Sequence, residues 1–410
     1  MNLDEIVEEQ FRNNRIYGVT KPKIIKEMLQ IPNRINIKRF ASKVDSYYET
    51  FYIKKTWAEN KPSKEERHQK FLNIEKEQSE RYKEIPLGEE KTRYRKIVTI
   101  NSSWLKKTQK RFNKILMDIL LTKKVRNVKR ESIIPYLHSA VKRRSYNTNA
   151  EVHVGDKYVI ALDLKDFYPS VTRYKLFLFF KDNFNLSPDI AMFYAVLSTT
   201  KSDDGSYKLG QGLSQSSTLA YLVNYTLFNY LYNLAKKNNM EMSIYVDDIV
   251  FSSSNPIPQK FVDQLFGIIK RNEMQIKRDK THNYKKESVK KITGVYIKGN
   301  KTRVANQKHE EIEVQYKKLQ ADVSRIANIS DYYKLYNLYL KFYGNYQHIN
   351  MVEKRVNDKY TEFISKYDEY FPKGINKNNK NINYCKGNIK NSKDIEKINK
   401  CFQKLRDKHD

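Results

Sequence analysis

Cysteine, glycine and long hydrophobic runs are all scarce in this sequence. Its two cysteines, Cys385 and Cys401, both lie near the C-terminus. This excludes a disulfide framework and a cysteine-based zinc site in the body of the chain. No stretch approaches the ~18 consecutive apolar residues of a membrane-spanning helix, and the first twenty residues carry four carboxylates instead of an apolar signal segment. We therefore expect a cytoplasmic protein without a membrane partner.

Acidic residues are also in deficit. Lys and Arg number 78 against 47 for Asp and Glu, which gives a formal net charge of +31. This charge far exceeds the magnitude of about 2–8 that solubility asks of a small domain, so it indicates a polyanionic partner, with nucleic acid as the first candidate. Because 13% of the residues are aromatic, the chain has the apolar surface for a folded core and is not a disordered basic tail.

The hydrophobic pattern predicts a mixed α+β chain. Strand-like runs occur at 47–53, 94–100, 158–162, 242–253 and 292–297, and helical spacing occurs at 104–121, 174–200, 216–237, 258–272 and 308–371. The run at 158–162 is apolar on both faces, so we expect it at the centre of a sheet. The run at 242–253 predicts two short strands around a tight turn.

Two clusters of carboxylates accompany these strands. Asp247 and Asp248 lie between apolar residues at the predicted turn, and Asp163 ends the predicted central strand. An Asp-Asp pair alone is a common hairpin device. If the two strands are neighbours, however, the three carboxylates converge at one end of a sheet, where burying them requires a cation. Oxygen ligands without His or Cys favour Mg²⁺, and two such ions are typical of phosphoryl transfer.

The order of these motifs resembles a reverse transcriptase. LDLKDFYPSV (162–171) resembles the first metal motif, LGQGLSQSS (209–217) the template-side motif, and YVDD (245–248) the second metal motif. Two further stretches narrow the resemblance to retron reverse transcriptases. Residues 149–153 (NAEVH) resemble their NAxxH motif, and residues 292–294 (ITG) resemble their VTG motif.

The resemblance implies a right-hand polymerase, an α+β fold in which helices flank an antiparallel palm sheet. It divides the chain into an N-terminal helical extension (1–46), fingers (47–157) with a charged insertion at 54–91, a palm (158–300) with finger helices near 174–208, a helical thumb (301–371) and a basic, weakly structured tail (372–410).

The resemblance also implies roles for individual residues. Asp163, Asp247 and Asp248 are the expected catalytic residues and the ligands of two Mg²⁺ ions, whereas Asp166 is expected to be structural. The residues expected to bind the incoming nucleotide are Arg95, Tyr168, Gln211 and Lys280. The residues expected to contact RNA or template are Asn149, His153, Gly212 and Gly294. A structural role for His153 and a turn-capping role for Asn149 are the alternatives.

The implied function is RNA-directed DNA synthesis in a bacterial antiphage retron. The expected partners are a structured noncoding RNA, its DNA product, deoxynucleoside triphosphates and an effector protein. Gly210 and Ser217 stand where the family commonly has proline, and the insertion and tail are further departures. Two alternatives therefore stay open: another defence-associated reverse transcriptase, protein-primed or making repetitive DNA, and a catalytically idle RNA-binding scaffold.

Overall fold

The computed structural model describes residues 2–54, 81–85, 87, 94–122, 130–355, 357–371 and 392–408. Most of the charged insertion predicted at 54–91 lies outside these ranges. The chain forms two compact units, one with residues 1–55 and 81–302 and the other with residues 303–410. The domain boundaries expected within the first unit remain predictions.

The central sheet of the first unit is antiparallel, in the strand order β10-β4-β8-β7. Its strands are β4 (Tyr158–Lys165), β7 (Glu241–Tyr245), β8 (Asp248–Ser253) and β10 (His282–Tyr284), and β9 (Gln275–Ile276) pairs with the end of β4. Strand β4 lies inside the sheet and buries Val159, Ile160, Leu162 and Leu164. The prediction of a buried central strand is therefore confirmed.

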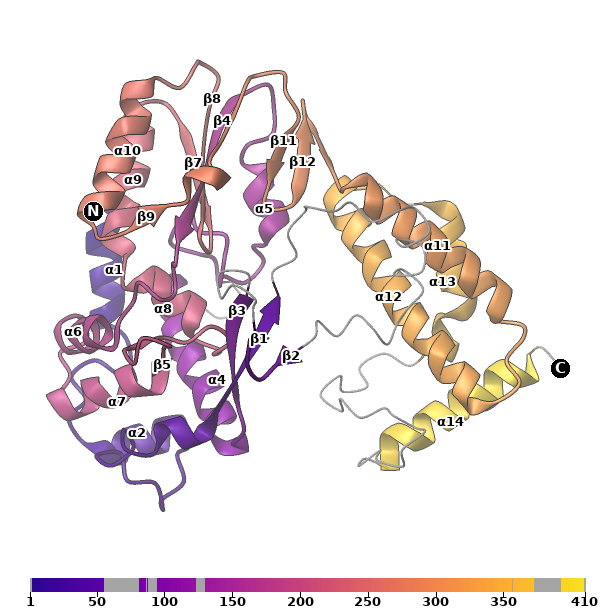
Figure 1. Ribbon diagram of the computed structural model, residues 1–410, viewed down its shortest axis with the longest axis horizontal. Helices are drawn as coiled ribbons and strands as arrows, with labels where there is room; N and C mark the ends of the chain where they lie inside the picture. Colours follow the sequence, from indigo (N-terminus) through magenta and orange to yellow (C-terminus); the bar gives the residue numbers. More distant parts are fainter. Residues whose placement is uncertain are drawn as a thin grey trace. The chain divides into compact units, whose positions relative to one another are not determined.

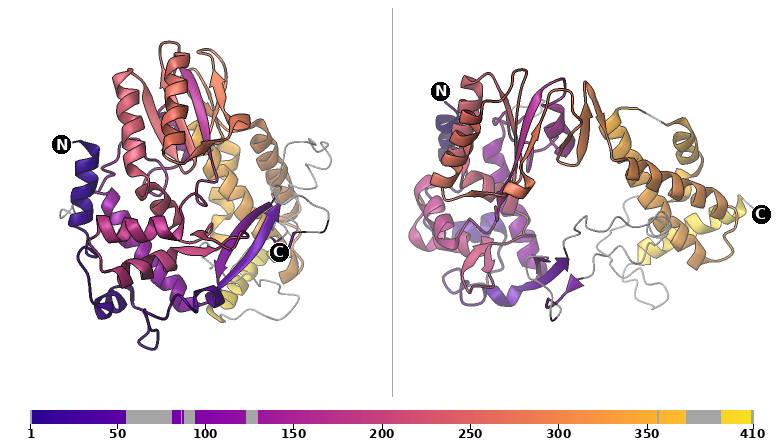
Figure 2. Two further views of the ribbon diagram at one scale, coloured as in Figure 1. Left: turned by 60° about the vertical axis from the view of Figure 1, so that its left-hand side comes forward. Right: turned by 45° about the horizontal axis from the view of Figure 1, so that its top comes forward.

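Helices cover both faces of this sheet (Figures 1 and 2). On one face lie α9 (Tyr225–Lys237) and α10 (Gln259–Arg271), and on the other lies α5 (Tyr146–Glu151). The amphipathic α10 buries Phe261, Val262 and Leu265 while its lysines remain exposed. A separate hairpin sheet, β11 (Lys290–Ile292), β12 (Val295–Lys298) and β13 (Lys301–Arg303), adjoins α5.

A second region of the first unit carries a sheet in the order β2-β1-β3. Strands β1 (Tyr48–Lys54) and β3 (Tyr94–Ile100) pair along their whole length, and β2 (Arg81–Tyr82) pairs with β1. The remaining elements are α1 (Leu3–Arg12), α2 (Pro22–Leu29), η1 (Val44–Tyr47), α4 (Ser103–Met117), η3 (Asp118–Leu120), α6 (Arg173–Asn183), α7 (Pro188–Ser198), β5 (Thr199–Lys201), β6 (Tyr207–Leu209), α8 (Ser216–Leu222) and η4 (Arg278–Lys280).

The helix predicted over 174–200 is in fact two helices. The chain leaves α6 through Asn185, whose backbone has a φ of 48°, and α7 begins at Pro188. Proline fits the first turn of a helix but not its interior, because it lacks an N–H and its ring crowds the preceding turn. The antiparallel sheet flanked by helices nevertheless confirms the α+β palm expected from the sequence.

The second unit consists of helices α11 (Asn306–Asp322), α12 (Ile329–Glu353), α13 (Asp358–Tyr367), η5 (Asp368–Tyr370) and α14 (Ser392–Asp407). Tyrosine supplies much of its core: Tyr332, Tyr336 and Tyr339 of α12 are buried, and Tyr339 stacks on Phe371 with ring centroids 4.2 Å apart. Helix α14 lies within the tail that was expected to be weakly structured. Its amphipathic pattern buries Ile398 and Leu405, which corrects the expectation for residues 392–407.

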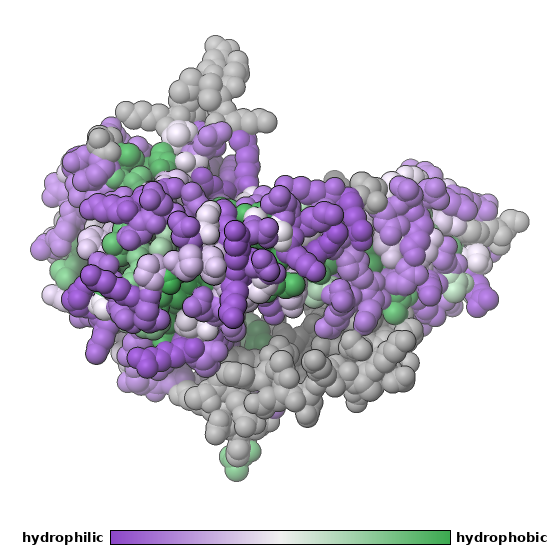
Figure 3. All heavy atoms as spheres, turned by 90° about the horizontal axis from the view of Figure 1, so that it is seen from above, coloured by the Kyte–Doolittle hydropathy of each residue, from purple (hydrophilic) through white to green (hydrophobic). Residues whose placement is uncertain are grey.

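The surface agrees with the basic composition. On the face shown in Figure 3, hydrophilic residues cover most of the described parts of each unit, with apolar residues in small scattered groups. Within the ranges that the structure describes, no helix combines the length and apolar character needed to span a membrane.

Candidate active site

The hairpin between β7 and β8 places two carboxylates on a strained turn. Tyr245 pairs with Asp248, so Val246 and Asp247 form the two-residue connection. Val246 has a φ of 60°, the conformation that the first position of a type II′ turn requires and that glycine adopts most readily. For a β-branched residue this costs on the order of 1–3 kcal/mol, and such strain commonly marks a functional site.

The third carboxylate lies directly across the sheet. Asp163 of β4 is the register partner of Asp248 of β8, and the backbone N–H of Leu164 donates to the carbonyl oxygen of Asp247 at 2.9 Å. Asp163 is buried, with 8% of its surface exposed. The structure therefore brings together the three aspartates that the sequence singled out.

Burial and mutual repulsion act on the two turn carboxylates. Burial, followed by repulsion from Asp247 and Asp163, raises the pKa of Asp248 to about 7. Burial and the charge of Asp163 also raise the pKa of Asp247. Neither Asp247 nor Asp248 forms an ion pair with any described residue. Among the described residues, the two turn carboxylates therefore have no direct counterion.

Asp163, in contrast, has protein counterions. Lys277 donates from its ammonium group to one carboxylate oxygen, and Lys280 lies 3.3 Å from the other. The backbone N–H of Lys277 also donates to the carbonyl oxygen of Asp163 at 2.8 Å. Lys280 was expected at the nucleotide. Lys277 was not assigned a role, because its link to Asp163 depends on the pairing of β9 with β4, which no local pattern indicates.

The carboxylates suit a hard cation by their chemistry. Three aspartate oxygen donors without His or Cys are typical of Mg²⁺ sites, and two of these carboxylates have no ion-pair partner in the part of the chain that the structure describes. Within the described ranges, however, no group of three or more His, Cys, Asp or Glu side chains is already arranged as a ligand cage. The ammonium group of Lys277 lies where a cation would contact Asp163. The donor set thus fits a metal by its chemistry, and a bound ion would have to displace the ammonium group of Lys277 from Asp163.

Two of the residues expected at the nucleotide lie in the electrostatic surroundings of these carboxylates. Arg95 projects from β3 as an exposed side chain, and its charge partly offsets the burial that raises the pKa of Asp247 and of Tyr168. Tyr168 is half-buried, and burial raises its pKa. Its hydroxyl lies 2.8 Å from that of Ser217, which fixes the ring. These positions are compatible with binding a triphosphate and a sugar.

Gln211 and Gly212 join the palm to β3. The carbonyl oxygen of Gln211 accepts a hydrogen bond from the backbone N–H of Val98 at 2.8 Å. Gly212 has a φ of 106°, and a Cβ added there would lie 2.5 Å from the carbonyl oxygen of Val98. Glycine is therefore required by the close approach of two backbones. This packing accounts for Gly212 without a template contact.

Asn149 and His153 are both inside the protein, at 0% exposure. The ring nitrogens of His153 lie 2.7 Å from the hydroxyls of Ser252 and Ser243, which belong to β8 and β7. Burial lowers the pKa of His153 to about 3, so the ring is neutral. In this conformation neither side chain contacts RNA directly. The hydrogen bonds of His153 join the two strands of the hairpin that carries Asp247 and Asp248. The carboxamide of Asn149 is bonded by no described residue. The expected contacts of both residues with RNA remain predictions.

The ITG turn contacts the helix that carries the start of the NAxxH-like motif. The Thr293 hydroxyl donates to the carbonyl oxygen of Tyr146 at 2.9 Å, which joins the ITG turn to the helix that contains Asn149. Thr293 and Gly294 have φ angles of 46° and 85°. A Cβ on Gly294 would meet no atom within 4 Å, so its glycine reflects backbone conformation. Asp166 likewise has a φ of 51°, and its backbone carbonyl oxygen accepts from the Ser170 N–H.

An antiparallel sheet with three aspartates at one end, joined through Gln211 to a basic strand, defines the palm of a right-hand polymerase. A family model described as reverse transcriptase (RNA-dependent DNA polymerase) matches residues 74–297, more than half of the chain. The chain therefore belongs to the reverse transcriptase family.

Curated relatives point to the retron branch of that family. The chain is 31% identical over 170 residues to the retron Se72 reverse transcriptase of Salmonella heidelberg, covering 40% of this chain and 44% of the relative. It is 29% identical over 185 residues to the retron Ec86 reverse transcriptase of Escherichia coli, covering 44% and 55%. The match thus spans about half the length of these curated relatives. Among solved structures, telomerase from Candida albicans is 10% identical, with 54% of this chain and 44% of that chain covered and a TM-score of 0.32.

Proposed function

We propose that this protein is an RNA-directed DNA polymerase of the retron type, which copies a structured noncoding RNA into DNA. The observation that carries the proposal is the convergence of Asp163, Asp247 and Asp248 at one end of the central sheet, in a chain of the reverse transcriptase family. The net charge of +31 supports a nucleic acid partner. Antiphage defence in the bacterial cytoplasm is the biological role that the retron resemblance suggests.

The three aspartates would hold two Mg²⁺ ions. When bound, these ions supply an activated attacking hydroxyl and stabilise the leaving pyrophosphate. Arg95 suits the triphosphate, because a guanidinium binds phosphate oxygens with two parallel hydrogen bonds. Lys280, which is half-exposed beside Asp163, suits the pyrophosphate end of the same nucleotide. Tyr168 would lie beneath the deoxyribose and exclude a 2′-hydroxyl.

Asn149 and His153 would serve this function as positioning residues. Through Ser243 and Ser252, His153 fixes β7 and β8 on either side of the catalytic turn. Residue 149 lies on the short helix that the ITG turn contacts, so the two motifs would support the palm together. The RNA would then be bound by exposed residues near these motifs.

Substitution of Asp247 tests the catalytic proposal. We expect Asp247→Asn to reduce primer extension on an RNA template at least 100-fold, because it removes a charge that holds the metal. RNA binding should change less than twofold. Asp166→Asn is the matched control, since it makes the same chemical change on a nearby exposed turn and should keep near-normal extension. Near-normal extension by Asp247→Asn would refute the proposed site.

Substitution of Tyr168 tests sugar selection. Tyr168→Ala should raise the use of ribonucleotides relative to deoxynucleotides at least tenfold in a competition assay. Tyr168→Phe keeps the ring but loses the hydroxyl contact with Ser217, so it should retain selection. A raised ribonucleotide ratio in the Phe variant as well would assign selection to the hydroxyl network, and an unchanged ratio in both would assign Tyr168 to the core.

The nucleic acid that copurifies with the full chain tests the retron assignment. A branched RNA–DNA species, identified by sequencing before and after debranching, is the expected result. DNA linked to tyrosine, or repetitive DNA, would instead indicate another defence-associated reverse transcriptase. RNA without DNA would indicate an RNA-binding scaffold.

A further inference from the structure

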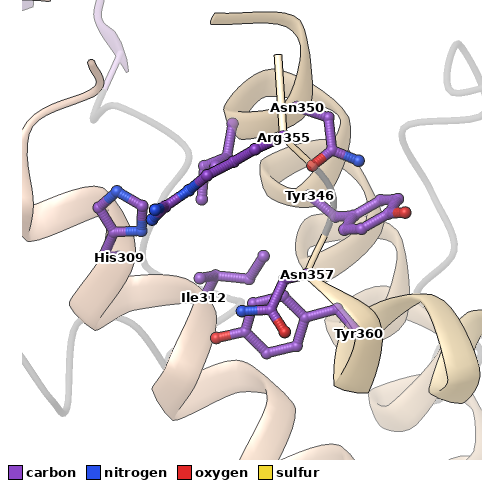
Figure 4. Close-up of a pocket in the computed structure, with 8 residues that line it drawn as sticks. His309, Ile312, Tyr346, Asn350, Arg355, Asn357 and Tyr360 are labelled. Atoms are coloured by element: carbon purple, nitrogen blue, oxygen red, sulfur yellow. The ribbon is translucent and has the colours of Figure 1, made fainter. Parts of the chain in front are cut away.

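Polar side chains from distant elements also meet outside the catalytic carboxylates. In the second unit, Figure 4 shows His309, Arg355 and Asn357 around a cavity between α11, α12 and α13. The cavity measures about 30 Å³, which is room for about one water molecule, so it is too small for a nucleotide. In the first unit, by contrast, such side chains join the β2-β1-β3 sheet to the hairpin formed by β5 and β6.

The base of the β5–β6 hairpin is fixed to the chain that continues from β4. The backbone N–H of Leu209 donates to the carbonyl oxygen of Val171 at 2.9 Å. Arg173 donates from Nε to the Thr199 hydroxyl at 2.8 Å, and its guanidinium group lies over the Tyr207 ring, 3.5 Å from the ring centroid. A guanidinium group stacked in this way is attracted to the ring electrostatically. Because β4 also carries a catalytic carboxylate, the hairpin is held at a set position relative to the site.

The tip of the hairpin carries Asp203, which accepts hydrogen bonds from two paired strands. The ammonium group of Lys96 in β3 and the hydroxyl of Tyr52 in β1 both donate to Oδ1 of Asp203, at 2.8 and 3.0 Å. Lys96 also donates to the carbonyl oxygen of Lys201 at 3.2 Å. Tyr52 and Lys96 are register partners, so their side chains lie on the same face of the sheet. The side chains of Lys96 and Asp203 are only 26% and 28% exposed, so water screens this ion pair less than one on the open surface.

The opposite face of β3 presents Arg95. Successive side chains of a strand point to opposite faces, so Arg95 points away from the face that Lys96 occupies. Its charge acts on the carboxylate of Asp247. Further along the strand, the N–H of Val98 donates to the carbonyl oxygen of Gln211, which directly follows the hairpin. The hairpin is thus attached to β3 both at its tip and just beyond its base, and both attachments are close to Arg95 in the strand.

We propose that Asp203 is a positioning residue for the incoming nucleotide. Through Lys96 and Tyr52 it holds β3 in the position from which Arg95 faces the catalytic carboxylates, so the guanidinium group is in place before a triphosphate binds. Affinity rises when a binding group is ordered before the ligand arrives, because ordering it then costs no binding free energy. Asp203 itself does not touch the nucleotide. The inference rests on the proposed function, in which Arg95 binds the triphosphate.

Nucleotide binding by the full chain on an annealed DNA primer and RNA template tests this role. The probe is the α,β-imido analogue of deoxythymidine triphosphate opposite a template adenine, because it binds without being transferred. Asp203→Ala should weaken analogue binding about 5- to 10-fold. In primer extension with dTTP, KM should rise by the same factor, while kcat should change less than about twofold. Asp182→Ala, which removes an exposed aspartate of α6, is the control and should change neither value.

Combination with Arg95→Ala separates positioning from stability. When Arg95 is already absent, Asp203→Ala should weaken analogue binding further by less than about twofold, because its effect passes through that side chain. Amide hydrogen exchange without nucleotide should become faster in β3 and in residues 199–209 and stay unchanged in β4 and β8. Lys96→Met, which removes the other member of the ion pair, should reproduce each of these results.

The inference would be overturned by unchanged analogue binding in both single variants or by unchanged hydrogen exchange in β3. It would also be overturned by a loss in the Arg95→Ala background as large as in the parent, which would mean that Asp203 acts on the fold in general. Failure of the parent chain to bind the analogue would instead refute the proposed function, together with the role of Arg95. The hydrogen-exchange result does not depend on catalysis, so it would still show whether Asp203 orders β3.

Discussion

The two units treat their buried carboxylates in opposite ways. In the second unit, Glu353 is fully buried and has Arg303, His309, Arg355 and the backbone N–H of Val304 around it. In the first unit, Asp247 and Asp248 stand beside each other and Asp163, and within the described ranges neither has an ion-pair partner. Repulsion and burial raise the pKa of both turn residues.

The difference separates a carboxylate that stabilises the fold from carboxylates that are available to bind an ion. A buried charge with several hydrogen-bonding cations contributes to folding, whereas a buried charge left without them destabilises it. Natural proteins retain such unfavourable groups where binding a ligand or ion makes use of them. The strained Val246 of the catalytic turn agrees with this reading, since strain is likewise retained at functional sites.

Replacing a buried carboxylate by its isosteric amide should lower the free energy of unfolding in the second unit and raise it in the first. This contrast is the largest effect we expect. Glu353→Gln should lower the free energy of unfolding by about 2 kcal/mol, because it removes the charge that two arginines share. Asp248→Asn should raise it by about 1 kcal/mol, because it removes a repelled and desolvated charge. Chemical denaturation of the full chain measures both, and amide hydrogen exchange assigns each change to its unit.

Glu362→Gln controls for the loss of a negative charge as such. Glu362 is exposed on α13, so its amide variant should stay within about 0.5 kcal/mol of the parent. Destabilisation by Asp248→Asn of the same size as by Glu353→Gln would show that both carboxylates are structural, and the comparison between the units would fail.

Acid should lower the stability of the first unit, because it protonates His153 on unfolding. His153 adds to the comparison a buried group that is neutral in the folded protein. Its pKa is about 3 in the folded protein, lowered by burial and then by the charges of Lys157 and His138, against 6.5 when unfolded. The unfolded chain therefore binds more protons, and stability falls as the pH drops from 6.5 towards 3. At pH 5 the loss from this residue is about 2 kcal/mol.

The variant His153→Gln isolates that contribution. Glutamine can still bond a serine hydroxyl but does not titrate. The difference in unfolding free energy between pH 7.5 and pH 5 should be about 2 kcal/mol smaller in the variant than in the parent. His138, whose pKa burial lowers to about 4, leaves part of the dependence in both proteins. Identical pH dependence would mean that the ring is protonated without loss of its serine contacts.

Local sequence patterns predicted the parts of the site that depend on a single strand or turn. The predicted strand at 94–100 has the bounds of β3, and the 158–162 run lies inside the buried β4. The convergence of Asp163 with Asp247 and Asp248 at one end of the sheet follows once the two strands are taken as neighbours. These predictions succeed because apolar runs and short turns are determined by residues close in the chain.

The sequence could not predict features that depend on distant parts of the chain. Lys277 meets Asp163 across 114 residues, and nothing in its basic neighbourhood distinguishes it. Asn149 and His153 belong to a motif that resembles one of retron reverse transcriptases, and the sequence leaves open whether they contact RNA or have a structural role. Their burial depends on the packing of α5 against β7. The partners of Glu353, which are Arg303, His309 and Arg355, likewise come from three separate parts of the chain.

The smallest effect concerns Lys277, the counterion of Asp163. Among the three aspartates, Asp163 resembles Glu353 in having cationic partners. Lys277 occupies one oxygen of Asp163, so a divalent cation must displace its ammonium group to bind there. Lys277→Gln should therefore lower the Mg²⁺ concentration for half-maximal primer extension about 3- to 5-fold, and should strengthen binding of Tb³⁺, followed by its luminescence, by a similar factor. Lys285→Gln makes the same charge change at an exposed position and should alter neither value. Lys280→Gln should fall between them, because that ammonium group is half-exposed and lies at 3.3 Å from the carboxylate. Lys277→Gln could instead raise the Mg²⁺ requirement and weaken Tb³⁺ binding. That result would mean that Lys277 holds Asp163 in place for the metal and does not compete with the metal for its carboxylate.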